Sequence, residues 1–486
     1  MQLTSVTGEL SVGEIHRYQL TLSSIPPQGV GVLLKVTNQA SVVKSLDLFN
    51  GCFRFSANCS PADPVRPTLP LTDLSPELQF SPAVNCGATW CIKLPTNMTH
   101  FILDLSSELI SSDSTIPYKV SISLSGANVS EAAAMEATLT PVETKEIWGA
   151  LNYEEVKEAL HLVILSHGLM GSQLDLLHLK EEIERANISS ANTKVVVLAY
   201  EVNHRLTMDG VYAGGDRITS KLLKEVEWEE RFGGPSATAS DSSPTYQISF
   251  IGHSLGGVYN LCSIGLLQQR TGGRFFDVFK PCHFVTIASP LLGSVELPWV
   301  ANQFCAVGGM GQSGRDLMLV DCTEEIDGFT NVAPDSRSIL VNMAYPGSPS
   351  HHALTKFRNR TAYANTTNDI SVGFLTSSLA SNFDVSQLVG GGFLSRMFSS
   401  RRPIETIVHV EEVELDEPIA EDHLHTQQLP ALAIRIANHL QTGMKWTKVL
   451  IYMDKITAHT DIIVRRWPRN SDGSKVIQHL LELHPL

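Results

Sequence analysis

The chain has 486 residues and a net charge of −14, from 36 Lys and Arg against 50 Asp and Glu. That acidity argues against a protein that binds nucleic-acid phosphates, because such binding depends on Lys and Arg. Hydrophobic residues make up 43% and charged residues 18% of the sequence, which allows a large core and excludes wholesale disorder. No apolar run approaches the roughly 18 residues of a membrane-spanning helix. The N-terminal segment lacks the pattern of a secretory signal.

Residues 1–128 are predicted to form a small β-sandwich that serves as an interaction or lipid-facing module. Several segments alternate apolar and polar residues, as half-buried strands do, and Pro- and Ser-rich stretches separate them. These segments are Glu14–Leu22, Val30–Val36, Phe101–Leu105 and Tyr118–Leu124. Without a signal peptide, the cysteines of this part are expected to be reduced thiols: Cys52, Cys59, Cys86 and Cys91.

Residues 129–158 are predicted to be a linker, and residues 159–486 an α/β domain. Short apolar strands alternate there with helical segments, which indicates a mostly parallel sheet with helices on both faces. Two irregular insertions, at about 295–357 and 377–425, are expected to be lids, binding loops or disordered segments. The predicted strands are His161–Ser166, Lys194–Tyr200, Tyr246–Ile251, His283–Ala288 and Lys448–Met453, and the predicted helices are Asp216–Glu230, Leu255–Gln269, Leu429–Gln441 and Lys475–Leu483.

The most informative motif is Gly252-His253-Ser254-Leu255-Gly256, which follows an apolar strand and leads directly into a helix. This is G-x-S-x-G in the strand–turn–helix setting of a nucleophile elbow, where glycines let the strand and the helix approach closely. Ser254 is therefore the predicted nucleophile, and the alternative is a tight turn with a solvated serine.

A serine hydroxyl needs a base to remove its proton, and the oxyanion formed on attack needs hydrogen-bond donors. A strand that ends in His167-Gly168 is typical of the place where α/β-hydrolases supply one oxyanion donor. We expect the backbone N–H groups of Leu169 and Leu255 to be the two donors. His167 is expected to shape the loop rather than to act as the base.

In this fold the acid and the base follow the nucleophile in the chain order Ser, Asp, His. Asp369, in a polar turn after a predicted strand at 360–365, is the predicted acid, and turn capping is its alternative role. His459, in the loop after the last strand, is the predicted base, oriented by Asp369 toward Ser254. The weaker competitors are Asp321 and Asp335 for the acid, and His479, His351, His352, His423 and His425 for the base.

Seven segments in order over about residues 150–486 resemble the serine esterases related to yeast-type lipid-droplet phospholipases and monoacylglycerol lipases. VGEIHRYQL (12–20) is similar to the start of the N-terminal domain of that family. The resemblance implies an α/β-hydrolase that cleaves glycerolipid acyl esters, with a triad at Ser254, Asp369 and His459. The matching segments are SHGLMGS (166–172), MDGVYAGGDRI (208–218), FIGHSLGG (250–257), FVTIASPLLGS (284–294), SGRDLMLVD (313–321), FRNRTAYANTTND (357–369) and AHTDIIVRR (458–466).

The predicted activity is that of a serine carboxylic-ester hydrolase, a lipase or phospholipase that forms an acyl-enzyme and requires no metal or organic cofactor. The protein would be cytoplasmic and act at a membrane or lipid-droplet surface, without a nucleic-acid partner. The same triad could instead cleave thioesters of proteins or small molecules, or transfer the acyl group to an alcohol. A catalytically silent lipid-binding scaffold is the alternative from another class.

Two further segments are predicted to contact lipid. Residues 284–294 with Leu297–Trp299 would line an acyl pocket, or else form ordinary core. Leu388–Arg402 combines apolar residues and arginines with three consecutive glycines, which predicts a hinged lid or a membrane-binding loop. The alternative for Leu388–Arg402 is a linker with scattered hydrophobic residues.

Overall fold

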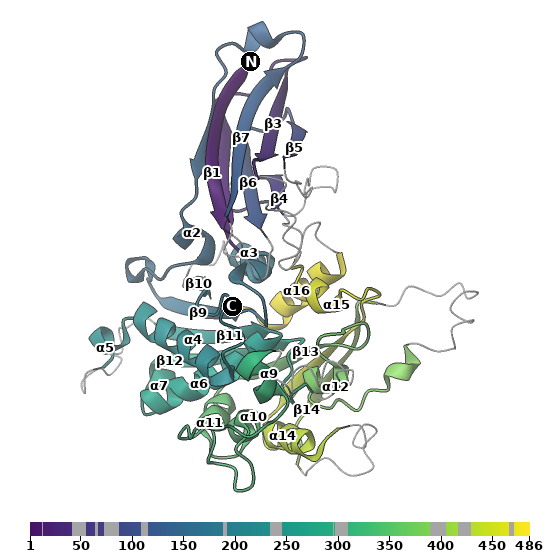
Figure 1. Cartoon of the computed structure of the whole chain (residues 1–486). Coiled ribbons are helices and arrows are strands. Elements are labelled where there is room, and N and C mark those ends of the chain that lie inside the picture. The colour runs from purple at the N-terminus through teal and green to yellow at the C-terminus, as the bar shows by residue number, and fades with distance from the viewer. Residues whose placement is uncertain are drawn as a thin grey trace, which may run out of the picture. The chain divides into compact units, whose positions relative to one another are not determined.

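The computed structural model of the chain forms two compact units, Met1–Gly149 and Ala150–Leu486, each of which is described by itself (Figure 1). No helix in the described part of the chain is long and apolar enough to cross a membrane. The structure describes residues 1–11, 13–40, 55–63, 67–71, 87–107, 115–187, 192–233, 245–294, 296, 310–388, 405–416, 429–465 and 471–486.

The first unit is a sandwich of two antiparallel four-stranded sheets, in the orders β1-β7-β3-β5 and β4-β6-β2-β8. Apolar side chains from alternate positions of both sheets form one buried core, including Leu34 and Val120 from one sheet and Leu20 and Leu103 from the other. Its elements are β1 (Gln2–Ser11), β2 (Ile15–Leu22), β3 (Gly31–Asn38), β4 (Phe55–Pro61), β5 (Thr89–Leu94), β6 (His100–Ser107), β7 (Thr115–Ser125), η2 (Val129–Ala132), β8 (Ala137–Pro141) and α2 (Thr144–Trp148).

Four strands of the sandwich lie outside the segments predicted from the sequence: β1, β4, β5 and β8. The pattern of β1 is too polar to stand out, yet the strand pairs along its whole length with β7. Part of the predicted linker at 129–158 is also a strand, because β8 pairs with β2. A strand at the edge of a sheet that has few apolar residues is defined by its hydrogen bonds to the neighbouring strand. The sequence does not show these bonds.

The second unit is built on one seven-stranded sheet with the order β10-β9-β11-β12-β13-β15-β14. Six strands are parallel, and β14 is antiparallel to β15 at the edge. The elements are η3 (Tyr153–Glu155), β9 (Ala159–Ser166), η4 (Gln173–Leu176), α3 (Leu177–Ala186), β10 (Thr193–Ala199), α4 (Val211–Glu225), α5 (Trp228–Arg231), β11 (Thr245–His253), α6 (Leu255–Arg270), α7 (Phe275–Val278), β12 (Phe279–Ile287), α9 (Gly311–Leu317), α10 (Ile339–Ala344), α11 (Pro349–Thr355), β13 (Asn359–Asn365), α12 (Phe374–Ser377), η5 (Val385–Gln387), β14 (Ile407–Val413), α14 (Ala431–Gln441), β15 (Trp446–Ile451), α15 (Ala458–Asp461) and α16 (Ser471–Leu483).

Helices cover both faces of this sheet, as the apolar strands predicted. On one face α6 packs against α4 and α11, and on the other α3 packs against α16 (Figure 1). The α6 helix is largely enclosed, because every residue from Leu255 to Leu267 is buried. The fold class is confirmed: a mostly parallel α/β sheet, accompanied by an antiparallel sandwich.

The carboxyl ends of the central strands lie level with one another. Gly252 near the end of β11 is opposite Ser166 at the end of β9, and Asn365 at the end of β13 is opposite Ile451 at the end of β15. The loops that follow these four strands therefore leave the sheet at the same edge. These are the loops that carry the predicted nucleophile, oxyanion donor, acid and base.

The two predicted insertions are more regular than expected. Residues 295–357 include α9, α10 and α11, and residues 377–425 include the edge strand β14. The consecutive Glu411 and Glu412 and the lack of fully buried side chains hide the strand Ile407–Val413 from an analysis of composition, and the pairing with β15 reveals it. The predicted membrane loop Leu388–Arg402 lies outside the described residues except for Leu388.

The described cysteines are free thiols: Cys59, Cys91, Cys262, Cys282 and Cys322. Cys52, Cys86 and Cys305 lie outside the described residues.

Candidate active site

Ser254 lies between the last residue of β11 and the first residue of α6, with φ 54° and ψ −132°. Such a conformation is strained by about 1–3 kcal/mol in a non-glycine residue and persists only where the surroundings fix it. Here the Ser254 N–H donates to the Ile287 carbonyl oxygen over 2.9 Å. A Cβ atom on Gly256 would lie 2.0 Å from the Ser166 carbonyl oxygen. Glycine at 256 thus lets α6 approach β9 and allows the tight turn at the serine.

The loop after β9 lies directly against this turn. A Cβ atom on Gly168 would lie 2.5 Å from the Cβ and 2.9 Å from the Oγ of Ser254. The loop is held by Met170, which has φ 53° and donates its N–H to Thr207 Oγ1 over 2.9 Å. The close approach of backbone to the serine hydroxyl is what an oxyanion site requires.

The two predicted oxyanion donors flank this contact. Leu169 follows Gly168, and Leu255 begins α6 at the end where helix N–H groups lack intrahelical acceptors. Among the described residues, neither N–H donates to a backbone carbonyl. Both amides are therefore available to an oxyanion beside Ser254.

Asp369 and His459, which are 90 residues apart in sequence, meet at the same edge of the sheet. His459 Nδ1 donates to Asp369 Oδ2 over 2.9 Å. The side chain of Asp369 is 2% exposed and that of His459 is 13% exposed. This contact leaves Nε2 of His459 as the nitrogen that can exchange a proton with a nucleophile.

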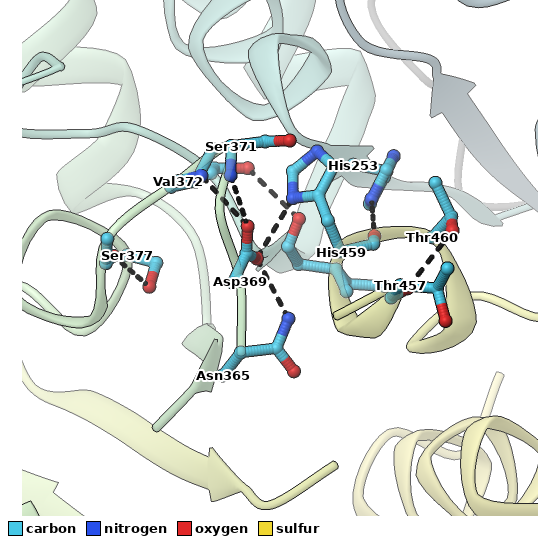
Figure 2. A network of polar contacts seen from close by, with 12 residues as sticks. His253, Asn365, Asp369, Ser371, Val372, Ser377, Thr457, His459 and Thr460 are labelled. Carbon is cyan, nitrogen blue, oxygen red and sulfur yellow. Dashed lines mark hydrogen bonds and ion pairs between the residues drawn. The ribbon is translucent and has the colours of Figure 1, made fainter. Parts of the chain in front are cut away.

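Figure 2 shows the Asp369 carboxylate at the centre of several hydrogen bonds. Oδ2 also accepts from Asn365 Nδ2 over 2.9 Å, and Oδ1 accepts from the N–H groups of Ser371 and Val372 at 3.0 and 2.9 Å. Burial by itself would raise the pKa of Asp369, but the hydrogen bonds from His459, Asn365 and Val372 outweigh it and lower the pKa below its ordinary value. Asp369 is thereby kept as the carboxylate that orients the imidazole.

His253, the residue before the nucleophile, supports the loop of the base. Its Nε2 donates to the carbonyl oxygen of His459 over 2.7 Å, and the two rings lie 4.7 Å apart between centroids (Figure 2). Burial, reinforced by the neighbouring His459, lowers the pKa of His253 well below its ordinary value, so its ring is neutral. Sequence analysis did not single out His253, because its hydrogen bond to His459 joins distant segments. It did not single out Asn365 either, although its partner Asp369 is only four residues away.

The Ser254 hydroxyl makes no hydrogen bond to His459 among the contacts of the described residues. Hydrogen bonds of catalytic groups are often long in the absence of substrate and tighten in the complex. The structure nevertheless brings His459 beside the elbow, because it contacts His253, the immediate neighbour of Ser254.

The two competing acids are engaged elsewhere. Asp321 accepts from the Arg337 N–H over 2.7 Å, as a turn-capping carboxylate does. Asp335 forms an ion pair with Arg435 over 2.6 Å.

The competing histidines also have other neighbours. His479 lies 3.0 Å from the Tyr363 hydroxyl, and His351 donates to the His439 carbonyl oxygen over 3.2 Å. His352 is exposed on α11, and His423 and His425 lie outside the described residues. The ring of His167 is buried in its own loop, where Nδ1 donates to the Gly168 carbonyl oxygen over 3.1 Å.

The predicted acyl-lining segment 284–294 belongs largely to the core: Leu291 and Leu292 are fully buried in the main apolar cluster. Leu297–Trp299 lies outside the described residues. Within the part of the chain that the structure describes, no group of three or more His, Cys, Asp or Glu side chains could hold a metal ion.

Residues 156–381 match the family described as "Putative serine esterase (DUF676)". This match lies within the second unit and includes the strands β9, β11, β12 and β13 and the serine at the elbow. It supports the resemblance to serine esterases that the motifs indicated.

Two relatives carry names of the same kind. A Schizosaccharomyces pombe protein named "Putative lipase C4A8.10" is 30% identical over 318 residues, 62% of this chain and 38% of that protein. A Saccharomyces cerevisiae protein named "Putative lipase ROG1" is 27% identical over 292 residues, 57% of this chain and 39% of that protein. The aligned part thus spans about two fifths of the length of these relatives.

Among solved structures, an esterase B from Lactobacillus rhamnosis inhibited by a tributyrin phosphonate is 13% identical, with a TM-score of 0.33. It matches over 68% of this chain and 77% of its own. A gene product from Listeria innocua matches over 68% of this chain and 95% of its own at 12% identity, with a TM-score of 0.30. Scores this low add nothing to the functional argument.

Proposed function

We propose that the protein is a serine lipase that hydrolyses fatty-acyl esters of glycerolipids, phospholipids or monoacylglycerols, through an acyl-enzyme. The observation that supports this most directly is the His459–Asp369 hydrogen bond at the sheet edge where Ser254 occupies a nucleophile elbow. The names of the relatives favour a lipid ester over other esters.

In the proposed acylation, Ser254 Oγ attacks the ester carbonyl carbon while His459 Nε2 takes the hydroxyl proton. The oxyanion accepts hydrogen bonds from the Leu169 and Leu255 N–H groups. Collapse of the tetrahedral intermediate breaks the ester bond, and His459 returns its proton to the departing alcohol.

In the proposed deacylation, a water molecule loses a proton to His459 and attacks the acyl carbonyl. Collapse then releases the fatty acid as the proton returns to Ser254 Oγ. The carboxylate of Asp369 accepts the Nδ1–H bond throughout and stabilises the imidazolium that forms twice in each cycle.

The experiment that tests this proposal combines a fluorophosphonate probe with hydrolysis assays on glycerolipids. The wild-type chain should be labelled on Ser254 and release fatty acid, and the Ser254→Ala variant should do neither. A labelled protein that releases no fatty acid from lipid but cleaves thioesters, or transfers the acyl group to an alcohol, would instead indicate one of the alternative uses of the triad. If the folded wild type were not labelled, the result would favour the alternative of a catalytically silent lipid-binding scaffold.

A further inference from the structure

Two isoleucines beside the candidate site are unusually exposed. Ile370 is 70% and Ile456 is 71% exposed, the highest values for large apolar side chains in the described part of the chain. Isoleucine is among the residue types most often buried. Single exposed apolar residues are common on soluble proteins, but clusters of them mark interaction sites.

The backbone brings these two residues close together. Asp369 and Thr457 form an isolated antiparallel β-bridge, and Ile370 follows Asp369 while Ile456 precedes Thr457. These two exposed neighbours of the bridge are here called the isoleucine pair.

The chain turns directly after Asp369. The Asp369 carboxylate is buried and accepts from His459 and from the N–H groups of Ser371 and Val372. The intervening residue, Ile370, lies on the surface of this turn, as its exposure shows. An apolar side chain is therefore exposed beside the candidate acid.

Further exposed apolar side chains lie on the loops across the nucleophile. Met170, after β9, and Leu206 and Met208, after β10, are 43%, 43% and 39% exposed. The hydrogen bond from the Met170 N–H to Thr207 Oγ1 holds these two loops together. Because β9 and β10 lie on one side of β11, and β13 and β15 on the other, apolar side chains flank Ser254 from both sides.

We propose that the isoleucine pair docks the protein on a lipid surface of low charge, beside the entrance to the site. The choice of a lipid surface rests on the proposed function, since a lipid ester must leave its aggregate to reach Ser254. The net charge of −14 disfavours attraction to anionic surfaces. Next to the pair, Lys455 is offset by Asp454, so burial of apolar area rather than charge would hold the protein there.

The test is flotation with phosphatidylcholine vesicles, carried out in the Ser254→Ala background so that the lipid is not consumed. The double variant Ile370→Ser/Ile456→Ser should partition onto the vesicles at least about tenfold more weakly. The matched control is Val410→Ser, which removes a 44% exposed apolar residue from the edge strand β14. The control should partition like the parent. Thermal unfolding of all three proteins verifies that each is folded.

A second measurement uses the intact Ser254. The ratio of activity on emulsified glycerolipid to activity on soluble p-nitrophenyl butyrate should fall about tenfold or more in the double variant and stay constant in Val410→Ser. Using a ratio separates docking from any change at the Asp369–His459 pair.

Equal vesicle partitioning of the double variant and its parent would overturn the proposal. So would a double variant that changes only self-association, measured by sedimentation, because the pair would then be a contact between two copies. If no ester is hydrolysed by the wild type but vesicle binding still depends on the pair, the proposed function fails and the docking surface stands.

Discussion

The second unit contains two groups of histidines with opposite surroundings. At the carboxyl ends of the strands, His459 is partly exposed and donates to the Asp369 carboxylate. Away from that edge, His161, His283 and His484 are buried against one another, with ring centroids 6.1 Å apart for the first two and 4.7 Å for the last two.

In the second group, His161 and His283 have neutral hydrogen-bond partners. His161 Nε2 lies 2.8 Å from Ser249 Oγ, and Asn359 Nδ2 donates to His283 Nδ1 over 3.0 Å. Burial lowers the pKa of His161 to about 3, of His283 to about 4 and of His484 to about 3. The comparison shows that burial is the largest cause that keeps the cluster histidines neutral, whereas His459 has a buried carboxylate as the acceptor of its Nδ1–H.

The largest effect is expected from variants that remove the side chains of Ser254 or His459 at the carboxyl ends of the strands. Ser254→Ala and His459→Ala should each lower ester hydrolysis by about 10⁴- to 10⁶-fold, because members of a triad act as a unit. For the same reason the double variant should be little worse than either single one. Rates of p-nitrophenyl butyrate hydrolysis measure both effects. Near-normal turnover in His459→Ala would redirect the search for the base to His479.

A subtler change removes only the charge next to the imidazole. Asp369→Asn preserves the shape but can reverse the tautomer of His459, so hydrolysis should fall on the order of 10⁴-fold. Circular dichroism should show that the variant remains folded. Abolished activity in Asp321→Asn together with normal activity in Asp369→Asn would contradict the assignment of the acid.

Removing the hydrogen bond between His253 and His459 should lower the rate of hydrolysis by a smaller factor. His253→Phe keeps a ring in place but removes the donor to the His459 carbonyl oxygen. Because a displacement of about 1 Å can slow a reaction on the order of 10²-fold, kcat should fall by about 10- to 100-fold while KM changes little. His479→Phe, far along the chain on α16, is the matched control and should retain kcat. A rise in KM with unchanged kcat would mean that His253 does not position the base.

The buried histidine cluster predicts acid sensitivity of the fold. In the unfolded chain, these histidines bind protons once the pH falls below the ordinary histidine pKa of about 6.5. In the folded protein they stay neutral at that pH, because burial has lowered their pKa values. Stability should therefore decline as the pH falls from about 6.5 to about 4, with each histidine contributing about 1.4 kcal/mol per pH unit. Denaturant unfolding at several pH values measures this slope.

The variant His283→Asn should make that slope shallower by about 1.4 kcal/mol per pH unit. At pH 8, well above the ordinary histidine pKa of about 6.5, the histidines of the cluster bind no protons in either state, so the native protein and the variant should have the same slope there. An unchanged acid slope in the variant would show that His283 is not held neutral by the fold.

Much of the fold and one part of the site could be predicted from the sequence because their signals are local. Strand, turn and helix around Ser254 are encoded within a few residues, where glycines at 252, 256 and 257 permit close backbone contacts. The central parallel strands are continuous apolar runs, which burial on both faces produces. The strands β1, β4, β5, β8 and β14 were not predicted, since pairing with a neighbour rather than apolar content defines them.

The sequence by itself determined the nucleophile elbow, the parallel sheet and the chain order in which an acid and a base could follow. Only the tertiary structure decided that Asp369 meets His459 rather than another of the 17 histidines, and that His253 supports the loop of the base. It also decided that the exposed residues Ile370 and Ile456 adjoin the bridge between Asp369 and Thr457. The physical reason is that such contacts depend on strand register and on a single β-bridge between distant segments, whereas sequence patterns report only which residues a segment buries.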